Sequence, residues 1–236
     1  MLFDPKLDLC HHQARLRDVG ALQIRGVLVP ETAHELSACL LNDVAWTLAW
    51  HDHQHQIGRS MTRDEYHGMP LDRRRQFLDQ LAQASLNRYG FAYEQYPMIT
   101  AYQEAWSPAH RLHRLVDELN SEPFLEMARQ LTGLSEIRRV SAQATRYSAG
   151  HFLRMHTDDV PEEGRLAAYV LNLTPSWNVD FGGLLHFVDK HGSIEEVYFP
   201  WFNSLSLFKV PRWHFVSMVM PWASSPRLSI TGWFRR

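Results

Sequence analysis

Short stretches of alternating apolar and polar residues fill the chain from Ser135 to its last residue, and turns rich in glycine or proline separate several of them. In an extended strand, alternate side chains point to opposite faces, so this pattern predicts strands. The predicted strands span residues 137–147, 152–156, 165–173, 184–189, 197–210 (strand, turn and strand), 214–220 and 226–233. Strands this frequent favour a barrel, which we place in this part of the chain.

Two histidines and an aspartate in this region form a candidate metal site. His156 and Asp158 are two residues apart on a predicted strand, so both side chains can face one ion. This is the one His-x-acid match in the chain, and about 1.5 are expected by chance, so the spacing alone has little weight. His214, which begins the apolar run 214–220, supplies a third ligand. Two histidines and a carboxylate that leave other metal positions open are the ligand set of non-haem iron(II) oxygenases.

An arginine follows the third candidate ligand, on the last predicted strand. Arg227, Ser229 and Thr231 occupy alternate positions of the segment 226–233 and therefore share a face. A guanidinium group and two hydroxyls on one face can hold a carboxylate together. The segment is thus a candidate site for an organic acid.

Residues 147–233 resemble a known family, the iron(II)- and 2-oxoglutarate-dependent dioxygenases, and within it the prolyl 4-hydroxylase-like branch. The matching residues, in the family's order, are Tyr147, His156-Thr157-Asp158, the strand 169–172, Gly182-Gly183, His214, Arg227, Thr231 and Trp233. Two features depart from the family pattern. The segment 209–213 before His214 is bulky where a small turn is expected, and the spacing from His214 to Arg227 is somewhat long.

The resemblance implies a fold, a set of cofactors and a reaction. The fold is α+β, a double-stranded β-helix (jelly-roll) barrel with N-terminal helices packed outside it. His156, Asp158 and His214 hold Fe(II), and Arg227, supported by Thr231 and Tyr147, pairs with the distal carboxylate of 2-oxoglutarate. The co-substrate is decarboxylated to succinate while O2 hydroxylates a C–H bond. That bond is expected to belong to a prolyl residue of a protein or peptide, with Arg165 placed to contact this substrate.

Several alternatives stay open from the sequence. The substrate can instead be a free amino acid or another small molecule, and the barrel can bind a metal or 2-oxoglutarate without turnover. Lys209 is a rival anchor for the co-substrate. His151 and His186 are weighed as ordinary polar histidines, and Trp233 is expected to fill the barrel rather than to form a wall of the pocket. The aromatic residues Trp201, Phe202, Trp213 and Trp222 border a peptide groove or belong to the core.

The N-terminal half, residues 1–134, is predicted to be a mainly helical scaffold with one early strand, packed on a catalytic core of residues 135–236 within one structural domain. Residues 21–29 alternate like a strand, and apolar residues recur at helical spacing over 31–46, 71–89 and 108–131. The third helical region is interrupted near Pro123, which suits the first turn of its second half.

Two polar clusters in this half are interpreted conservatively. Alternate histidines in the segment 51–55 resemble a metal tract, but we expect a polar loop. The loop 54–70 is long enough for a lid or a substrate-binding role. The three arginines 73–75 fan around a helix, so we expect a solvated face.

Bulk properties predict a cytoplasmic protein. The formal net charge of −2 gives no reason to expect binding to nucleic acid or to a membrane. The two cysteines, Cys10 and Cys39, are too few for a disulfide framework, and the first residues lack the pattern of a secretory signal. Both a monomer and a homodimer are compatible with the sequence.

Overall fold

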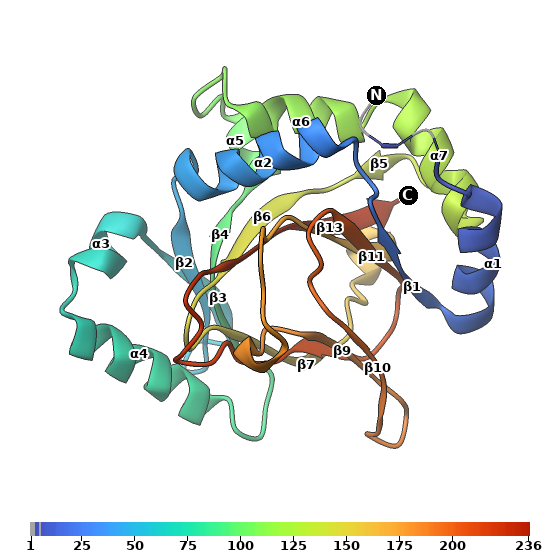
Figure 1. Ribbon diagram of the computed structural model, residues 1–236. Coiled ribbons are helices and arrows are strands. Elements are labelled where there is room, and N and C mark those ends of the chain that lie inside the picture. Colours follow the sequence, from blue (N-terminus) through green and yellow to red (C-terminus); the bar gives the residue numbers. More distant parts are fainter. Residues whose placement is uncertain (1–2, 5) are drawn as a thin grey trace.

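The computed structural model describes residues 3–4 and 6–236, which form helices packed on a largely antiparallel sheet (Figure 1). The helices are α1 Leu9–Val19, α2 Pro30–Asn42, α3 Arg63–Gly68, α4 Leu71–Ala84, α5 Met98–Gln103, α6 Arg111–Leu119 and α7 Glu122–Thr132. The strands are β1 Ala21–Arg25, β2 Thr47–Asp52, β3 Ile57–Thr62, β4 Phe91–Tyr96, β5 Arg139–Val140, β6 Gln143–Tyr147, β7 Phe152–His156, β8 Arg165–Asn172, β9 Leu185–Val188, β10 Ile194–Tyr198, β11 Ser204–Lys209, β12 His214–Val216 and β13 Arg227–Arg235.

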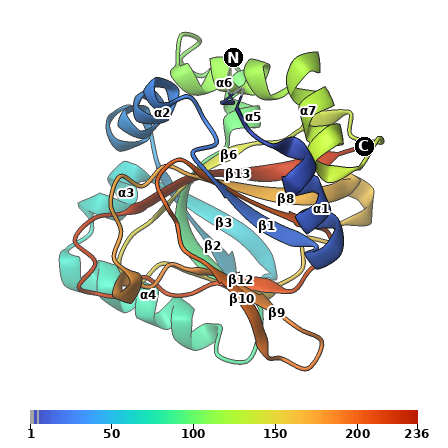
Figure 2. The same ribbon diagram turned by 45° about the vertical axis from the view of Figure 1, so that its right-hand side comes forward.

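The sheet curls into a nearly closed barrel, as predicted. Its strand order is β1-β11-β8-β13-β6-β4-β7-β12-β9-β10, and every described pairing is antiparallel. Strand β4 pairs with both β6 and β7 and so joins the two sides of the barrel. Figure 2 shows β12, β9 and β10 across the interior from β6, β13 and β8.

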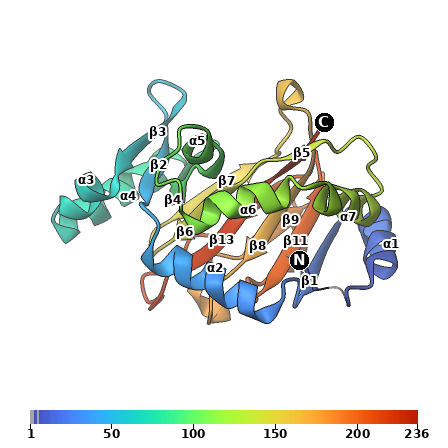
Figure 3. The same cartoon turned by 90° about the horizontal axis from the view of Figure 1, so that it is seen from above.

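Helices cover one side of this barrel. Seen from above, α2, α6 and α7 lie across β6, β13, β8 and β11, whereas α3 and α4 lie beyond β2 and β3 (Figure 3). Strand β13 shows how the two layers are separated. Its Leu228 and Ile230 are fully buried in the core shared with the helices, whereas Arg227, Ser229 and Thr231 line the barrel cavity. The period of two along the strand thus gives one apolar and one polar face.

Several predictions for the N-terminal half are confirmed. Strand β1 and helices α4 and α6 lie within the predicted segments, α2 and α7 extend one residue beyond theirs, and Pro123 is in the first turn of α7. The helix predicted over 31–46 ends at Asn42, because the chain turns there and buries Trp46 before entering β2.

The prediction of a single N-terminal strand is wrong, because β2, β3 and β4 also precede residue 135. The segment 54–70, expected to be a long loop, contains β3 and the helix α3, which begins with a capping box between Thr62 and Glu65. Strands β1 and β4 belong to the barrel sheet itself. We therefore propose that the two halves form one structural domain.

The C-terminal strands are close to those predicted, with three differences. The entry strand 137–147 is split into β5 and β6, the strand expected to begin at residue 197 is β10 and begins at Ile194, and the strand predicted over 214–220 ends at Val216. Within residues 3–4 and 6–236, no helix combines the length and the apolar character needed to span a membrane.

Candidate metal centre and adjoining cavity

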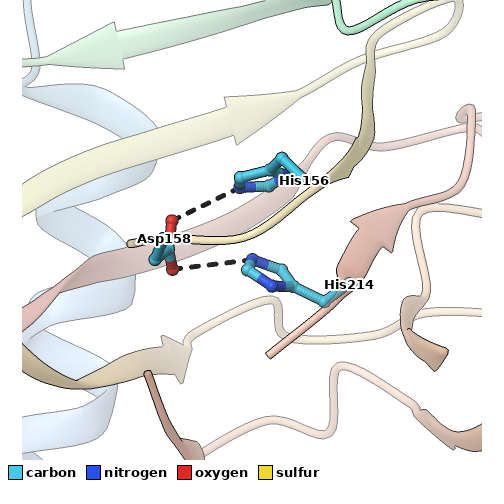
Figure 4. Close-up of side chains that lie close together, drawn as sticks. All are labelled: His156, Asp158 and His214. Carbon is cyan, nitrogen blue, oxygen red and sulfur yellow. Dashed lines mark ion pairs between the residues drawn. The ribbon is translucent and has the colours of Figure 1, made fainter. Parts of the chain in front are cut away.

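The three predicted metal ligands meet at the ends of two paired strands. His156 is the last residue of β7, Asp158 follows two residues later, and His214 begins β12, where it pairs directly with His156. The Nε2 atom of His156 lies 3.3 Å from Oδ1 of Asp158, and Nε2 of His214 lies 3.6 Å from Oδ2 of the same carboxylate (Figure 4). One ligand atom from each residue lies within 4.8 Å of the others. Among the described residues, no other three His, Cys, Asp or Glu side chains meet in this way.

Backbone contacts set the orientation of both imidazoles. The Nδ1 atom of His156 lies 2.9 Å from the carbonyl oxygen of Arg154, and Nδ1 of His214 lies 2.8 Å from that of Arg212. A carbonyl accepts a hydrogen bond, so the proton of each neutral ring belongs on Nδ1. Each Nε2 lone pair then points toward the aspartate. Metal-binding histidines usually donate the N–H of their other ring nitrogen to a carbonyl in this way.

The charges at this centre also suit a cation. Burial lowers the pKa of His214 to about 4, and the neighbouring His156 adds to this effect. Burial acts to raise the pKa of Asp158, but the neighbouring His156 and His214 outweigh it, so the net shift is downward. At neutral pH the centre holds a carboxylate and a neutral imidazole, the protonation states that metal ligands require.

A cavity of about 730 Å³ extends from this centre into the barrel. Three partly exposed side chains, Tyr89, Met155 and Trp213, lie at its outer end, with 40%, 47% and 48% of their surfaces exposed. Its inner part is lined by buried residues of β6, β8 and β13. The cavity thus joins a partly exposed rim, the candidate metal centre and a buried interior that contains Arg227.

Arg227 occupies the inner part of this cavity and is 3% exposed. Its Nη2 atom donates a hydrogen bond to Oδ1 of Asn172 over 3.3 Å. Its Nε and Nη1 atoms have no partner in the structure, and burial lowers its pKa to about 10. A buried, incompletely paired cation is costly, so this position is suited to an anion.

Tyr147 and Thr231, the predicted partners of Arg227, line the same cavity. Tyr147 pairs with Arg227 across β6 and β13, and the guanidinium carbon lies 5.5 Å from the centre of its ring. The ring of Tyr147 also stacks on Tyr93, with 5.0 Å between the centroids. The predicted carboxylate-binding residues thus lie around one space.

Arg165, the predicted substrate contact, lies beside the metal centre. Its Nη1 atom donates to the backbone oxygen of Asp158 over 3.3 Å, and its Nε atom donates to Glu163 over 2.9 Å. The guanidinium carbon lies 3.7 Å from the centre of the Trp233 ring, which also lines the cavity. Arg165 is therefore held by backbone, carboxylate and aromatic contacts at once.

The rival residues lie elsewhere. His151 is fully buried in the turn before β7, where its Nδ1 atom accepts a hydrogen bond from the amide of Ser148. His186 stacks on Phe215 with 4.4 Å between the ring centroids. Phe208 lines the cavity, so its neighbour Lys209 lies on the opposite face of β11.

The histidines of the segment 51–55 do not form a metal site with one another in the structure. His55 pairs with Asp52, and His53 contacts the hydroxyl of Ser85. The segment ends β2 and forms the turn toward β3.

Sequence reasoning missed three residues that line or shape the cavity. Tyr89 packs against the metal-centre residue His156, with 5.6 Å between the ring centroids, and Tyr93 lies on the unpredicted strand β4. Asn172 lies within the recognised strand 169–172 but was given no role. A polar residue at an alternating, inward position of a buried strand was the available signal for Asn172.

Comparison with known proteins identifies the region that contains all of these candidate ligands. Residues 142–235 match the sequence model of the 2OG-Fe(II) oxygenase superfamily. Residues 142–235 belong to this superfamily. Membership of the 2OG-Fe(II) oxygenases implies Fe(II) and 2-oxoglutarate as metal and co-substrate.

Two curated relatives of this oxygenase region are the Prolyl 3-hydroxylase OGFOD1 proteins of Mus musculus and Xenopus laevis. The mouse protein is 32% identical over 124 residues, which are 50% of this chain and 22% of the relative. The frog protein is 32% identical over 120 residues, which are 48% of this chain and 23% of the relative. The aligned part thus spans less than a quarter of either relative.

Solved structures share the fold over nearly the whole chain. A Pseudomonas putida prolyl-4-hydroxylase matches with a TM-score of 0.59 and 18% identity, covering 97% of this chain and 98% of that one. A 2OG-Fe(II) oxygenase family protein from Burkholderia pseudomallei gives a TM-score of 0.60 at 12% identity, covering 98% and 92%. A Trichoplax adhaerens prolyl hydroxylase, solved with a peptide of hypoxia inducible factor, gives 0.57 at 16% identity, covering 98% and 94%.

Proposed function

We propose that this protein is an Fe(II)- and 2-oxoglutarate-dependent dioxygenase that hydroxylates a prolyl residue of a protein or peptide. One observation carries the proposal. A His-Asp-His centre and a buried, incompletely paired arginine line a single cavity inside the barrel. Non-haem iron oxygenases use such a centre, and a dicarboxylate co-substrate requires such a cation.

The donor atoms fit Fe(II). His156 and His214 would bind it through Nε2, since their Nδ1 atoms face backbone carbonyls, and Asp158 would bind it through its carboxylate. When bound there, iron would supply the chemistry that couples O2 to decarboxylation of 2-oxoglutarate to succinate and to hydroxylation of a C–H bond. The protein's part is to hold the ligands in one orientation and to leave the other metal positions accessible.

The inner cavity fits the distal carboxylate of 2-oxoglutarate. Arg227 has two nitrogen atoms without partners, and a guanidinium group binds a carboxylate through two parallel hydrogen bonds. Tyr147 on the neighbouring strand β6 and Thr231 on β13 itself would add hydroxyl contacts. Burial would strengthen each of these contacts by excluding water.

The rim of the cavity supports a peptide substrate. Tyr89, Met155 and Trp213 form a partly exposed apolar rim next to the metal centre, which an extended chain segment can reach without entering the inner cavity. Arg165 would contact that segment from beside Asp158. The names of the relatives and of two structural neighbours, which are prolyl hydroxylases, favour a prolyl target over a free amino acid.

Anaerobic titration with Fe(II) and 2-oxoglutarate tests the cofactor assignment. The chelate should give a weak visible charge-transfer band, which His156→Ala should abolish and Arg227→Ala should weaken. His191→Ala, in the exposed turn between β9 and β10, and Lys209→Ala serve as matched controls and should keep the band. A wild-type protein that binds Fe(II) but gives no band with 2-oxoglutarate would overturn the proposal.

Turnover then tests the substrate class. Proline-containing peptides should stimulate succinate formation and gain one oxygen atom each, as mass spectrometry would show. Stimulation by free amino acids but by no peptide would favour the small-molecule alternative. A band without succinate from any substrate would favour a binding barrel. The cytoplasmic location and the choice between monomer and homodimer stay predictions.

A further inference from the structure

We propose that Asn172 is a positioning residue that orients Arg227 for a carboxylate while leaving its charge uncompensated. The inference rests on the proposed function, because its ligand is the distal carboxylate of 2-oxoglutarate. Asn172 ends β8 between β11 and β13, where it pairs with Ser204 on one side and Ser229 on the other. It is 1% exposed, so each polar atom of its amide needs a partner within the protein.

The surroundings of Asn172 fix which way its amide points. Nδ2 lies 3.2 Å from Oγ of Ser204, 3.5 Å from the backbone oxygen of Ser204 and 3.4 Å from that of Val170. The Ser204 hydroxyl donates its own proton to the backbone oxygen of Trp201 over 2.7 Å, so it is left to accept from Asn172. Only an NH2 group satisfies these acceptors, and Oδ1 must then face Arg227.

This orientation gives Arg227 a fixed and neutral partner. Oδ1 of Asn172 accepts from Nη2 of Arg227 over 3.3 Å, and Nη2 keeps a second hydrogen while Nε and Nη1 keep theirs. A complete edge of the guanidinium group is therefore left for a carboxylate. An aspartate at the same position would compensate the charge and repel the ligand.

The test compares two ligands that differ only at the distal end. 2-Oxoglutarate and 2-oxopentanoate share a five-carbon chain and the 2-oxo acid group, but only the first carries a second carboxylate. Their dissociation constants would be measured anaerobically on the Fe(II)-loaded wild type, Asn172→Ala and Asn172→Asp. The matched control is Ser37→Ala, which removes a buried hydroxyl that donates to the backbone oxygen of Leu173, the residue after Asn172.

We expect Asn172→Ala to weaken binding of 2-oxoglutarate about tenfold, because a hydrogen bond that orients a charged group is lost. Binding of 2-oxopentanoate should not change. Asn172→Asp should weaken 2-oxoglutarate further than alanine does and again spare 2-oxopentanoate. Ser37→Ala should alter the affinity of neither acid.

Two results would overturn the inference while sparing the proposed function. Equal weakening of both acids in the Asn172 variants would show a general structural defect, and unchanged affinity for 2-oxoglutarate would show that Arg227 needs no such partner. A wild type that fails to bind 2-oxoglutarate at all, or binds both acids equally, would instead remove the proposed role of Arg227 itself. That result is read from the wild type alone, so the two failures are distinguishable.

Discussion

Replacing Arg227 with methionine should make the ligand-free protein more stable and abolish its response to 2-oxoglutarate. Arg227 is buried with one hydrogen-bond partner, Asn172, and no ion pair in the structure. Methionine has a similar length, fills the same space and carries no charge. The substitution therefore separates the effect of the buried charge on the stability of the fold from its effect on ligand binding.

The size of the effect follows from burial of the charge. Burial lowers the pKa of Arg227 to about 10, well below its ordinary value. The lowered pKa means that the folded state holds this proton less tightly than the unfolded state, so the cost is fully present at neutral pH and is relieved only above about pH 10. It amounts to about 3 kcal/mol, and loss of the Asn172 hydrogen bond offsets about 1 kcal/mol of it.

The net gain of about 2 kcal/mol should raise the Tm by about 4–8 °C for a domain of this size. The assay is thermal unfolding with Mn(II) in place of Fe(II), with and without 2-oxoglutarate. The wild type should gain stability on addition of the acid by mass action, and the variant should not. Lys209→Met, on the other face of β11, is the control and should retain the ligand response. A lower Tm for ligand-free Arg227→Met would refute the reasoning, because it would show that the buried charge stabilises the fold.

Three further predictions concern residues around the site. Burial lowers the pKa of His151 to about 4, so the unfolded chain binds a proton that the folded protein excludes between about pH 6.5 and 4. The free energy of unfolding should fall by up to about 3 kcal/mol as the pH drops through this window, and denaturant titrations should show a smaller fall in His151→Asn. Glu163→Gln should raise the KM for a peptide several-fold with little change in kcat, because the carboxylate that holds Arg165 is lost; an unchanged KM would argue against a substrate role for Arg165. A Cβ atom at position 232 would lie 1.8 Å from the backbone oxygen of Ser141, so Gly232→Ala should destabilise the fold by about 3 kcal/mol, and an unchanged Tm would contradict this packing.

The barrel and the metal centre could be predicted because their signals are local. Strand β13 shows apolar residues at alternate positions over Leu228 and Ile230, β8 contains an unbroken apolar run of strand length, and His156 and Asp158 are two residues apart. His214 was found because it begins an apolar run, and the position of Arg227 followed from its place on the last strand. The direct pairing of His214 with His156 belongs to the tertiary structure alone.

Strand β4 could not be predicted, because its sequence contains a charged residue at a position that is buried in the structure. Glu94 lies in the middle of the strand and is 1% exposed, a position where a carboxylate argues against a buried strand. The structure pairs it with Arg146 over 2.8 Å and with His67 over 3.2 Å, residues far away in sequence. Because these partners are far away in sequence, the pattern of the segment alone does not predict a strand of the barrel.

Strands β2 and β3 were missed for a different reason. All but one residue of β3 are exposed, so its sequence carries no buried face to give an alternating pattern. The hairpin is specified by its pairing with β2 and by the attachment of β2 to β4, which is itself a long-range contact. A strand without a buried face shows no alternation of apolar and polar residues, so hydrophobic periodicity does not predict it.

The chemistry of the cavity and the stability of the fold depend on the same register of β13. Leu228 and Ile230 face the helices while Arg227 and Ser229 face the cavity. A shift of the β13 register by one residue would therefore move each of these side chains to the opposite face of the sheet. It would bury the guanidinium group of Arg227 among the leucines of the core and place Leu228 in the inner cavity where Arg227 lies now. Gly232 opposes such a slip, since only a residue without a side chain fits against Ser141 at that point. The position of the proposed carboxylate anchor is therefore fixed by packing on the far side of the strand, and substitutions in the helix-facing core should alter the affinity for 2-oxoglutarate wherever they shift β13.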